Sequence, residues 1–178
     1  MIILGVDPGT LFTGYGVIHY DKELKYISSG IIKLSSKQPM PVRLEIIYNE
    51  LNDVMTKYLP TEFSIETAFF GKNVQSVLKI GYARGVSILA AMHNKLSVNE
   101  YSPREIKKAI VGSGSSSKEQ VNYMVKTLLH LDKEFSKLDE SDALASAICH
   151  AFRYKSFNTK SGSWKSFIDA NPHLIIKG

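Results

Sequence analysis

The chain has 178 residues, 44% hydrophobic and 22% charged, which is enough apolar material for one packed domain and excludes a disordered, collagen-like or coiled-coil protein. No apolar run approaches the roughly 20 residues that span a bilayer, so we expect no membrane segment. Twenty-two Lys and Arg residues against 17 Asp and Glu give a net charge of +5, which favours a polyanionic partner but is also common in proteins that bind none.

The N-terminal part of the chain predicts three strands. The apolar run at residues 2–6 indicates a central buried strand, and Asp7-Pro8-Gly9 would end it in a turn. Residues 14–20 and 24–34 are rich in Tyr, Val and Ile and predict two antiparallel strands. No basic residues precede the first apolar run, so we expect no signal peptide and a cytoplasmic protein.

Helices and two more strands follow. The predicted strands are 63–66 and 96–101, and the predicted helices are one beginning at Pro41, 74–92, a short one after Pro103, one beginning at a Ser117–Gln120 capping box, and 139–152. Residues 112–117 predict a flexible loop, and residues 155–178 a tail without periodicity. This order of elements predicts an α/β fold in which helices cover a mixed sheet.

Four carboxylates stand in places that suit chemistry, although each has an ordinary explanation. Asp7 ends the most apolar strand, where ligands gather in open α/β sheets, but it also suits a simple turn. Glu66 lies on the strand face opposite Phe63, and a solvated face would explain it alone. Asp139 and Asp142 are three residues apart at a helix start, where acids also serve as caps.

The combination of the four acids is harder to explain by turns and caps. If two strands and a helix brought them together, they would repel one another strongly without cations. Carboxylate oxygens suit Mg²⁺, with Mn²⁺ as a substitute, and the single cysteine, Cys149, excludes a Cys-rich zinc site. Two such ions could activate water and stabilise the leaving oxygen of a phosphodiester. The acids therefore predict a site for two divalent ions.

Five segments, in order over residues 1–152, resemble the RuvC family of bacterial Holliday-junction resolvases, which belongs to the RNase H-like nucleases. They are GVDPGTLFTGYGVI (5–18), SIETAFFGKN (64–73), KIGYARGVSILAA (79–91), KKAIVGSGSSSKEQV (107–121) and DESDALASAICH (139–150). The resemblance implies a mixed five-stranded sheet flanked by helices on both sides, in a nuclease domain at 1–154. The tail at 155–178 matches nothing in the family and has no assigned role.

The resemblance also implies an activity. A homodimer would nick two opposing strands of a four-way DNA junction symmetrically, leaving 5′-phosphate and 3′-hydroxyl ends. Asp7, Glu66, Asp139 and Asp142 would hold two Mg²⁺ ions in each subunit. Cooperation with the RuvA and RuvB branch-migration proteins is suggested by the family alone.

Further residues gain candidate roles from the resemblance. Phe69 would contact bases, although one of two adjacent Phe residues usually packs in a core. Four lysines would contact phosphates, although lysines are usually just solvated: Lys72, Lys107, Lys108 and Lys118. Gly81 and Gly85 share one helix face and would permit close packing, against the sheet or, as the family suggests, against a second subunit.

Three alternatives compete with a resolvase. A YqgF-type RNase H-like nuclease acting on structured RNA shares the Asp-Pro-Gly opening but not the basic block at 107–121. An actin-like or kinase-like nucleotide-binding protein would need a second lobe, for which 178 residues leave no room. A non-catalytic junction-binding protein would require a damaged acid set, whereas all four acids are present.

Overall fold

The computed structural model describes residues 1–67, 74–132 and 134–159, with side chains described up to residue 154. The strands are β1 (Ile2–Asp7), β2 (Phe12–Tyr20), β3 (Leu24–Lys33), β4 (Glu62–Glu66) and β5 (Ser97–Tyr101). The helices are α1 (Met40–Tyr58), α2 (Val74–His93), α3 (Pro103–Val111), α4 (Lys118–Leu128) and α5 (Leu138–Thr159). Within the described residues, the order of elements matches the prediction.

The five strands form one mixed sheet in the order β3-β2-β1-β4-β5. β1 pairs antiparallel with β2, and β2 with β3, as expected for consecutive strands joined by short turns. β1 pairs in parallel with β4, and β4 with β5, and these connections contain the helices α1 and α2. The predicted α/β fold with a mixed five-stranded sheet is confirmed.

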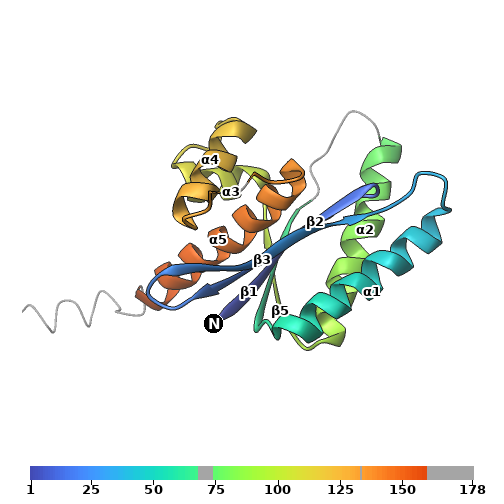
Figure 1. Ribbon diagram of the computed structural model, residues 1–178, viewed down its shortest axis with the longest axis horizontal. Coiled ribbons are helices and arrows are strands. Elements are labelled where there is room, and N and C mark those ends of the chain that lie inside the picture. The colour runs from blue at the N-terminus through green and yellow to red at the C-terminus, as the bar shows by residue number, and fades with distance from the viewer. Residues whose placement is uncertain (68–73, 133, 160–178) are drawn as a thin grey trace, which may run out of the picture.

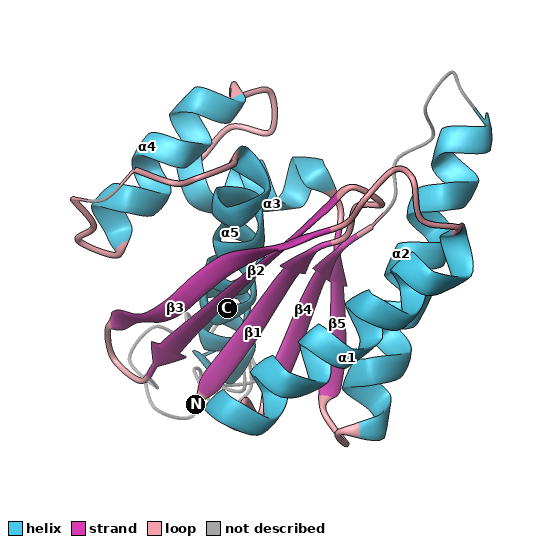
Figure 2. Ribbon diagram, turned by 45° about the vertical axis from the view of Figure 1, so that its right-hand side comes forward, coloured by secondary structure: helices cyan, strands magenta, loops and turns pink. Residues whose placement is uncertain are grey.

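Helices cover both faces of this sheet (Figures 1 and 2). α1 and α2 lie together on one face, while α3, α4 and α5 lie on the other. The alternation of side chains in β1 supplies both layers, because Ile3 packs in the α5 layer and Leu4 and Val6 pack in the α1 and α2 layer. The central strand is therefore buried on both sides, as its apolar sequence predicts.

Helix α5 lies unusually close to the central strands. A methyl group added to Gly5 of β1 would overlap the backbone of Ala143, and one added to Gly14 of β2 would overlap that of Asp139. Ala143 and Ala147, which face Gly5, are fully buried at this contact. Small residues on both elements thus place the first turn of α5 directly against the ends of β1 and β2.

The end of α5 differs from the prediction. The helix continues to Thr159, seven residues beyond the expected end at Phe152, so the first five residues of the expected tail at 155–178 are helical. No Gly or Pro interrupts this stretch, and a helix already nucleated by packing extends at little cost. Among the described residues, none of the helices is both long and apolar enough to cross a bilayer.

Candidate active site

Asp7 and Glu66 lie side by side at one end of the sheet. They are the last residues of the neighbouring parallel strands β1 and β4, which pair Val6 with Ile65 immediately before them. Val6 and Ile65 both pack in the α1 and α2 layer. The next residue along each strand therefore faces the α5 layer, so both carboxylates point to the same side.

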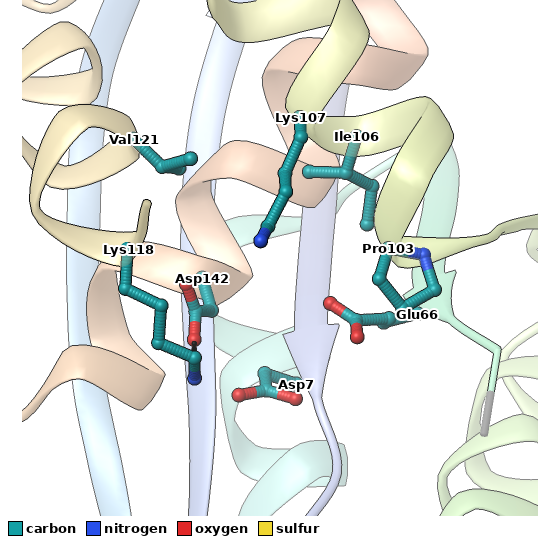
Figure 3. Close-up of a pocket in the computed structure, with 8 residues that line it drawn as sticks. All are labelled: Asp7, Glu66, Pro103, Ile106, Lys107, Lys118, Val121 and Asp142. Atoms are coloured by element: carbon teal, nitrogen blue, oxygen red, sulfur yellow. Dashed lines mark hydrogen bonds and ion pairs between the residues drawn. The ribbon is translucent and has the colours of Figure 1, made fainter. Parts of the chain in front are cut away.

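The N-terminal part of α5 brings further acids to the same place. Asp142 lines a cavity of about 170 Å³ together with Asp7 and Glu66 (Figure 3). The other lining residues come from α3 and α4: Pro103, Ile106, Lys107, Lys118 and Val121. Asp139 does not line this cavity, but its charge acts on Asp7. The structure thus gathers three of the four predicted acids around one cavity, with the fourth nearby.

Crowding and burial change the acidity of these groups. Burial, followed by the charges of Glu66, Asp142 and Asp139, raises the pKa of Asp7 well above its usual value. Burial and the charge of Asp142 raise the pKa of Glu66 to about 7. Both shifts mean that a full set of ionised carboxylates is unfavourable here without added positive charge.

The chemistry of the donors fits a hard divalent cation. Carboxylate oxygens are the ligands that Mg²⁺ and Mn²⁺ prefer, and cations would relieve the repulsion that the raised pKa values record. Within the described part of the chain, no group of three or more His, Cys, Asp or Glu side chains is already arranged to hold a metal ion. The fit therefore rests on the type and placement of the donors.

Two of the predicted phosphate-binding lysines reach the cavity. Lys107 points into it from α3 and Lys118 from α4 (Figure 3), and the Nζ of Lys118 donates to Oδ2 of Asp142 at 2.9 Å. Lys108 is exposed on α3 and does not line the cavity. The predicted contacts Phe69 and Lys72 lie outside the described residues.

The predicted interface glycines lie on an exposed apolar side of α2. A Cβ at Gly81 or Gly85 would have no atom within 4 Å, so among the described residues these glycines are not explained by packing against the sheet. Large apolar side chains are exposed at helical spacing beside Gly85, and they form what we call the α2 stripe: Leu78, Tyr82, Leu89 and Met92.

One contact near the site, between Ser64 and Ser146, was not anticipated from the sequence. Ser64 of β4 bonds Ser146 of α5, joining the elements that carry Glu66 and Asp142. The sequence contained one signal for this contact: Ser64 follows Phe63 in a strand, so its side chain faces the opposite side of the sheet, which is also buried.

Cys149 of α5 is fully buried, and burial raises the pKa of its thiol to about 12. This is expected for a packing residue rather than a nucleophile.

Comparison with protein families gives a match over nearly the whole chain. Residues 3–150 match the family model described as "Crossover junction endodeoxyribonuclease RuvC". A protein of that description from Chloroherpeton thalassium is 45% identical over 186 residues, covering 99% of this chain and 100% of the relative. One from Saccharophagus degradans is 45% identical over 163 residues, covering 91% of this chain and 94% of the relative.

Solved structures of RuvC proteins are also similar to this chain. The RuvC structure from Thermus thermophilus superposes with a TM-score of 0.81 at 28% identity, covering 88% of this chain and 97% of that chain. The same protein in complex with a Holliday junction substrate superposes with a TM-score of 0.80 at 27% identity, covering 88% of this chain and 96% of that chain. The yeast mitochondrial Holliday junction resolvase Ydc2 shares the fold alone, with a TM-score of 0.57 at 14% identity. The expected RNase H-like fold is confirmed.

Proposed function

Because the chain belongs to the RuvC family of crossover junction endodeoxyribonucleases, we propose that it resolves four-way DNA junctions by metal-dependent hydrolysis at the cavity beside Asp7, Glu66 and Asp142. The observation that supports this most directly is the meeting of three carboxylates from β1, β4 and α5 with two lysines in one cavity. The runner-up, a YqgF-type nuclease acting on RNA, gains no comparable support.

The acids would hold the metal. Asp7, Glu66 and Asp142 line the cavity, and Asp139 lies one helical turn before Asp142, so these four would provide the ligands for two Mg²⁺ ions, or for Mn²⁺ in their place. Such ions supply an activated water and stabilise the leaving oxygen of a phosphodiester. The predicted products are a 5′-phosphate and a 3′-hydroxyl.

The lysines would hold the DNA backbone. Lys107 and Lys118 border the acids from α3 and α4, where a phosphate entering the cavity would meet both ammonium groups. Lys108, exposed on α3, would contact a phosphate farther from the site. Phe69 and Lys72 remain predicted DNA contacts.

The α2 stripe would form the interface of a homodimer. Exposed apolar side chains in line along a helix mark an interaction surface, and because no described residue lies within 4 Å of a Cβ at Gly81 or Gly85, a second helix could approach closely there. A two-fold dimer would present two such cavities to one junction, as symmetric nicking requires. The nuclease unit at 1–154, the cytoplasmic location and the cooperation with RuvA and RuvB stay predictions.

A cleavage assay tests the proposed function. A four-way junction with a mobile centre samples many sequences at the crossover, and a linear duplex of the same sequence is the control substrate. We expect paired, symmetric nicks on the junction alone, only with Mg²⁺, and binding without nicks for Asp7→Asn. Equal cutting of the linear duplex, or cleavage by Asp7→Asn, would contradict the proposal.

A further inference from the structure

The ion pair between Lys118 and Asp142 joins two of the residues that line the acidic cavity. Lys118 is the first residue of α4, and Asp142 lies in the early part of α5, so the pair joins two separate helices. The Lys118 side chain is 59% exposed and that of Asp142 16% exposed. The lysine therefore reaches from solvent to an acid that is largely enclosed.

Lys118 occupies a position that the helix itself disfavours. It follows the N-cap Ser117, where the helix dipole presents positive charge and a cation is unfavourable. The acids offset this cost, since the Nζ of Lys118 donates to Oδ2 of Asp142 at 2.9 Å and Asp7 and Glu66 line the same cavity. The carboxylates thus determine where this ammonium rests.

Lys107 provides a contrast within the same cavity. It also points toward the acids, and its charge acts on Glu66, but among the described residues no ion pair joins it to a carboxylate. The two lysines therefore add the same charge to the cavity, while only Lys118 occupies a carboxylate oxygen.

We propose that Lys118 is an exchangeable counter-ion of the metal site: it pairs with Asp142 in the metal-free protein and leaves that acid when the carboxylates take up a divalent cation. This rests on the proposed function, in which Asp142 is a metal ligand. The released ammonium is then free to contact a DNA phosphate at the cavity. Metal and DNA would each favour the released lysine, so each would increase the affinity for the other.

Mn²⁺ binding without DNA tests the exchange. The free Mn²⁺ signal in electron paramagnetic resonance is followed during titration of metal-free wild type, Lys118→Gln and Lys107→Gln. Both variants lose one positive charge beside the acids, but only Lys118→Gln also frees an oxygen of Asp142. We expect Lys118→Gln to bind Mn²⁺ about two- to fivefold more tightly than Lys107→Gln, which is within the range for one partly exposed ion pair. Equal or weaker binding by Lys118→Gln would overturn the proposal.

A further variant separates this inference from the proposed function. If wild type binds Mn²⁺ and Asp7→Asn does not, the metal site stands, and equal affinities of the two lysine variants would then reject the exchange alone. If wild type does not bind Mn²⁺, or binds it no more tightly than Asp7→Asn does, both the metal site and the exchange are rejected. Tighter Mn²⁺ binding by Lys118→Gln, together with its loss in the double variant that also carries Asp7→Asn, supports both the metal site and the exchange.

Discussion

Ser64 and Ser146 hold β4 against α5 by a buried pair of hydrogen bonds. The hydroxyl of Ser64 donates to the carbonyl oxygen of Ser146 at 2.8 Å, and the two hydroxyl oxygens lie 2.7 Å apart. Both residues are fully buried. Ser64 lies two residues before Glu66, and Ser146 lies one helical turn after Asp142, so this contact joins the strand and the helix that carry the two carboxylates.

We predict that Ser64→Ala lowers both stability and cleavage. The substitution leaves the buried hydroxyl of Ser146 without its partner, which costs about 1–3 kcal/mol in the free energy of unfolding. Looser spacing of Glu66 and Asp142 should also reduce kcat about tenfold, because small misplacements of reacting groups are costly. Urea denaturation and single-turnover cleavage measure the two effects.

The matched control is Ser97→Ala, which removes the hydroxyl of an exposed serine at the start of the neighbouring strand β5. It should change the free energy of unfolding by no more than about 0.5 kcal/mol and leave kcat unaltered. Equal effects of the two substitutions would show that the buried serine pair does not position the acids.

Gly14→Ala should be strongly destabilising. The added methyl group would overlap the backbone of Asp139, so α5 would have to move away from β2, at a cost of about 3 kcal/mol or more. Gly81→Ala is the contrasting change within one subunit: among the described residues nothing lies within 4 Å of the new methyl, and loss of a helical glycine should stabilise the monomer by up to about 1 kcal/mol. Thermal melts of both variants check the prediction, and a mild effect at Gly14 would refute the close contact.

Asp7→Asn should stabilise the metal-free protein while removing cleavage. A neutral amide avoids the burial cost and the repulsion from Glu66, Asp142 and Asp139 that raise the pKa of Asp7, so we expect a gain of about 1–2 kcal/mol. Denaturation in EDTA at pH 8 measures it. In excess Mg²⁺ wild type should become the more stable of the two proteins, because only wild type gains the full free energy of metal binding. A variant less stable than wild type in EDTA would contradict this account.

The stability of the metal-free protein should fall as the pH rises from about 4.5 to about 7. Glu66 has its pKa raised from 4.5 to about 7, so the folded state retains a proton that the unfolded state has already lost. The folded state is therefore favoured at low pH, and the loss, at most about 3 kcal/mol, is complete above pH 7. Denaturation at pH 5 and pH 8 in EDTA should show a smaller difference for Glu66→Gln. An identical pH dependence in that variant would remove Glu66 as the cause.

Most of the fold was predictable because its signals are local. The apolar run at residues 2–6 showed a strand buried on both faces, and the capping box at Ser117 is present as expected, with Ser117 and Gln120 each bonding the backbone of the other. The end of α5 was not predictable, because residues 153–159 contain neither a stop signal nor a regular apolar pattern. The earlier part of α5 is packed on the sheet and nucleates the helix, so the following residues extend it at little cost.

The gathering of Asp7, Glu66 and Asp142 around one cavity was predictable, but the ion pair of Asp142 with Lys118 was not. Asp7 and Glu66 could be placed from strand ends and alternation, whereas the partner of Lys118 lies 24 residues away on another helix. The sequence did contain a signal, since a lysine in the first turn of a helix indicates a nearby anion. Which anion it meets depends on how α4 and α5 pack, which local patterns do not encode.

The acidic cavity takes its first carboxylate from the first strand of the chain and Asp142 from the last helix described. A ribosome-bound chain that has emerged only as far as α4 carries Asp7 and Glu66 but neither acid of α5. Such a chain also lacks the helix that packs on β1 and β2. The order of the elements thus leaves the proposed metal site without Asp139 and Asp142 until α5 has been made.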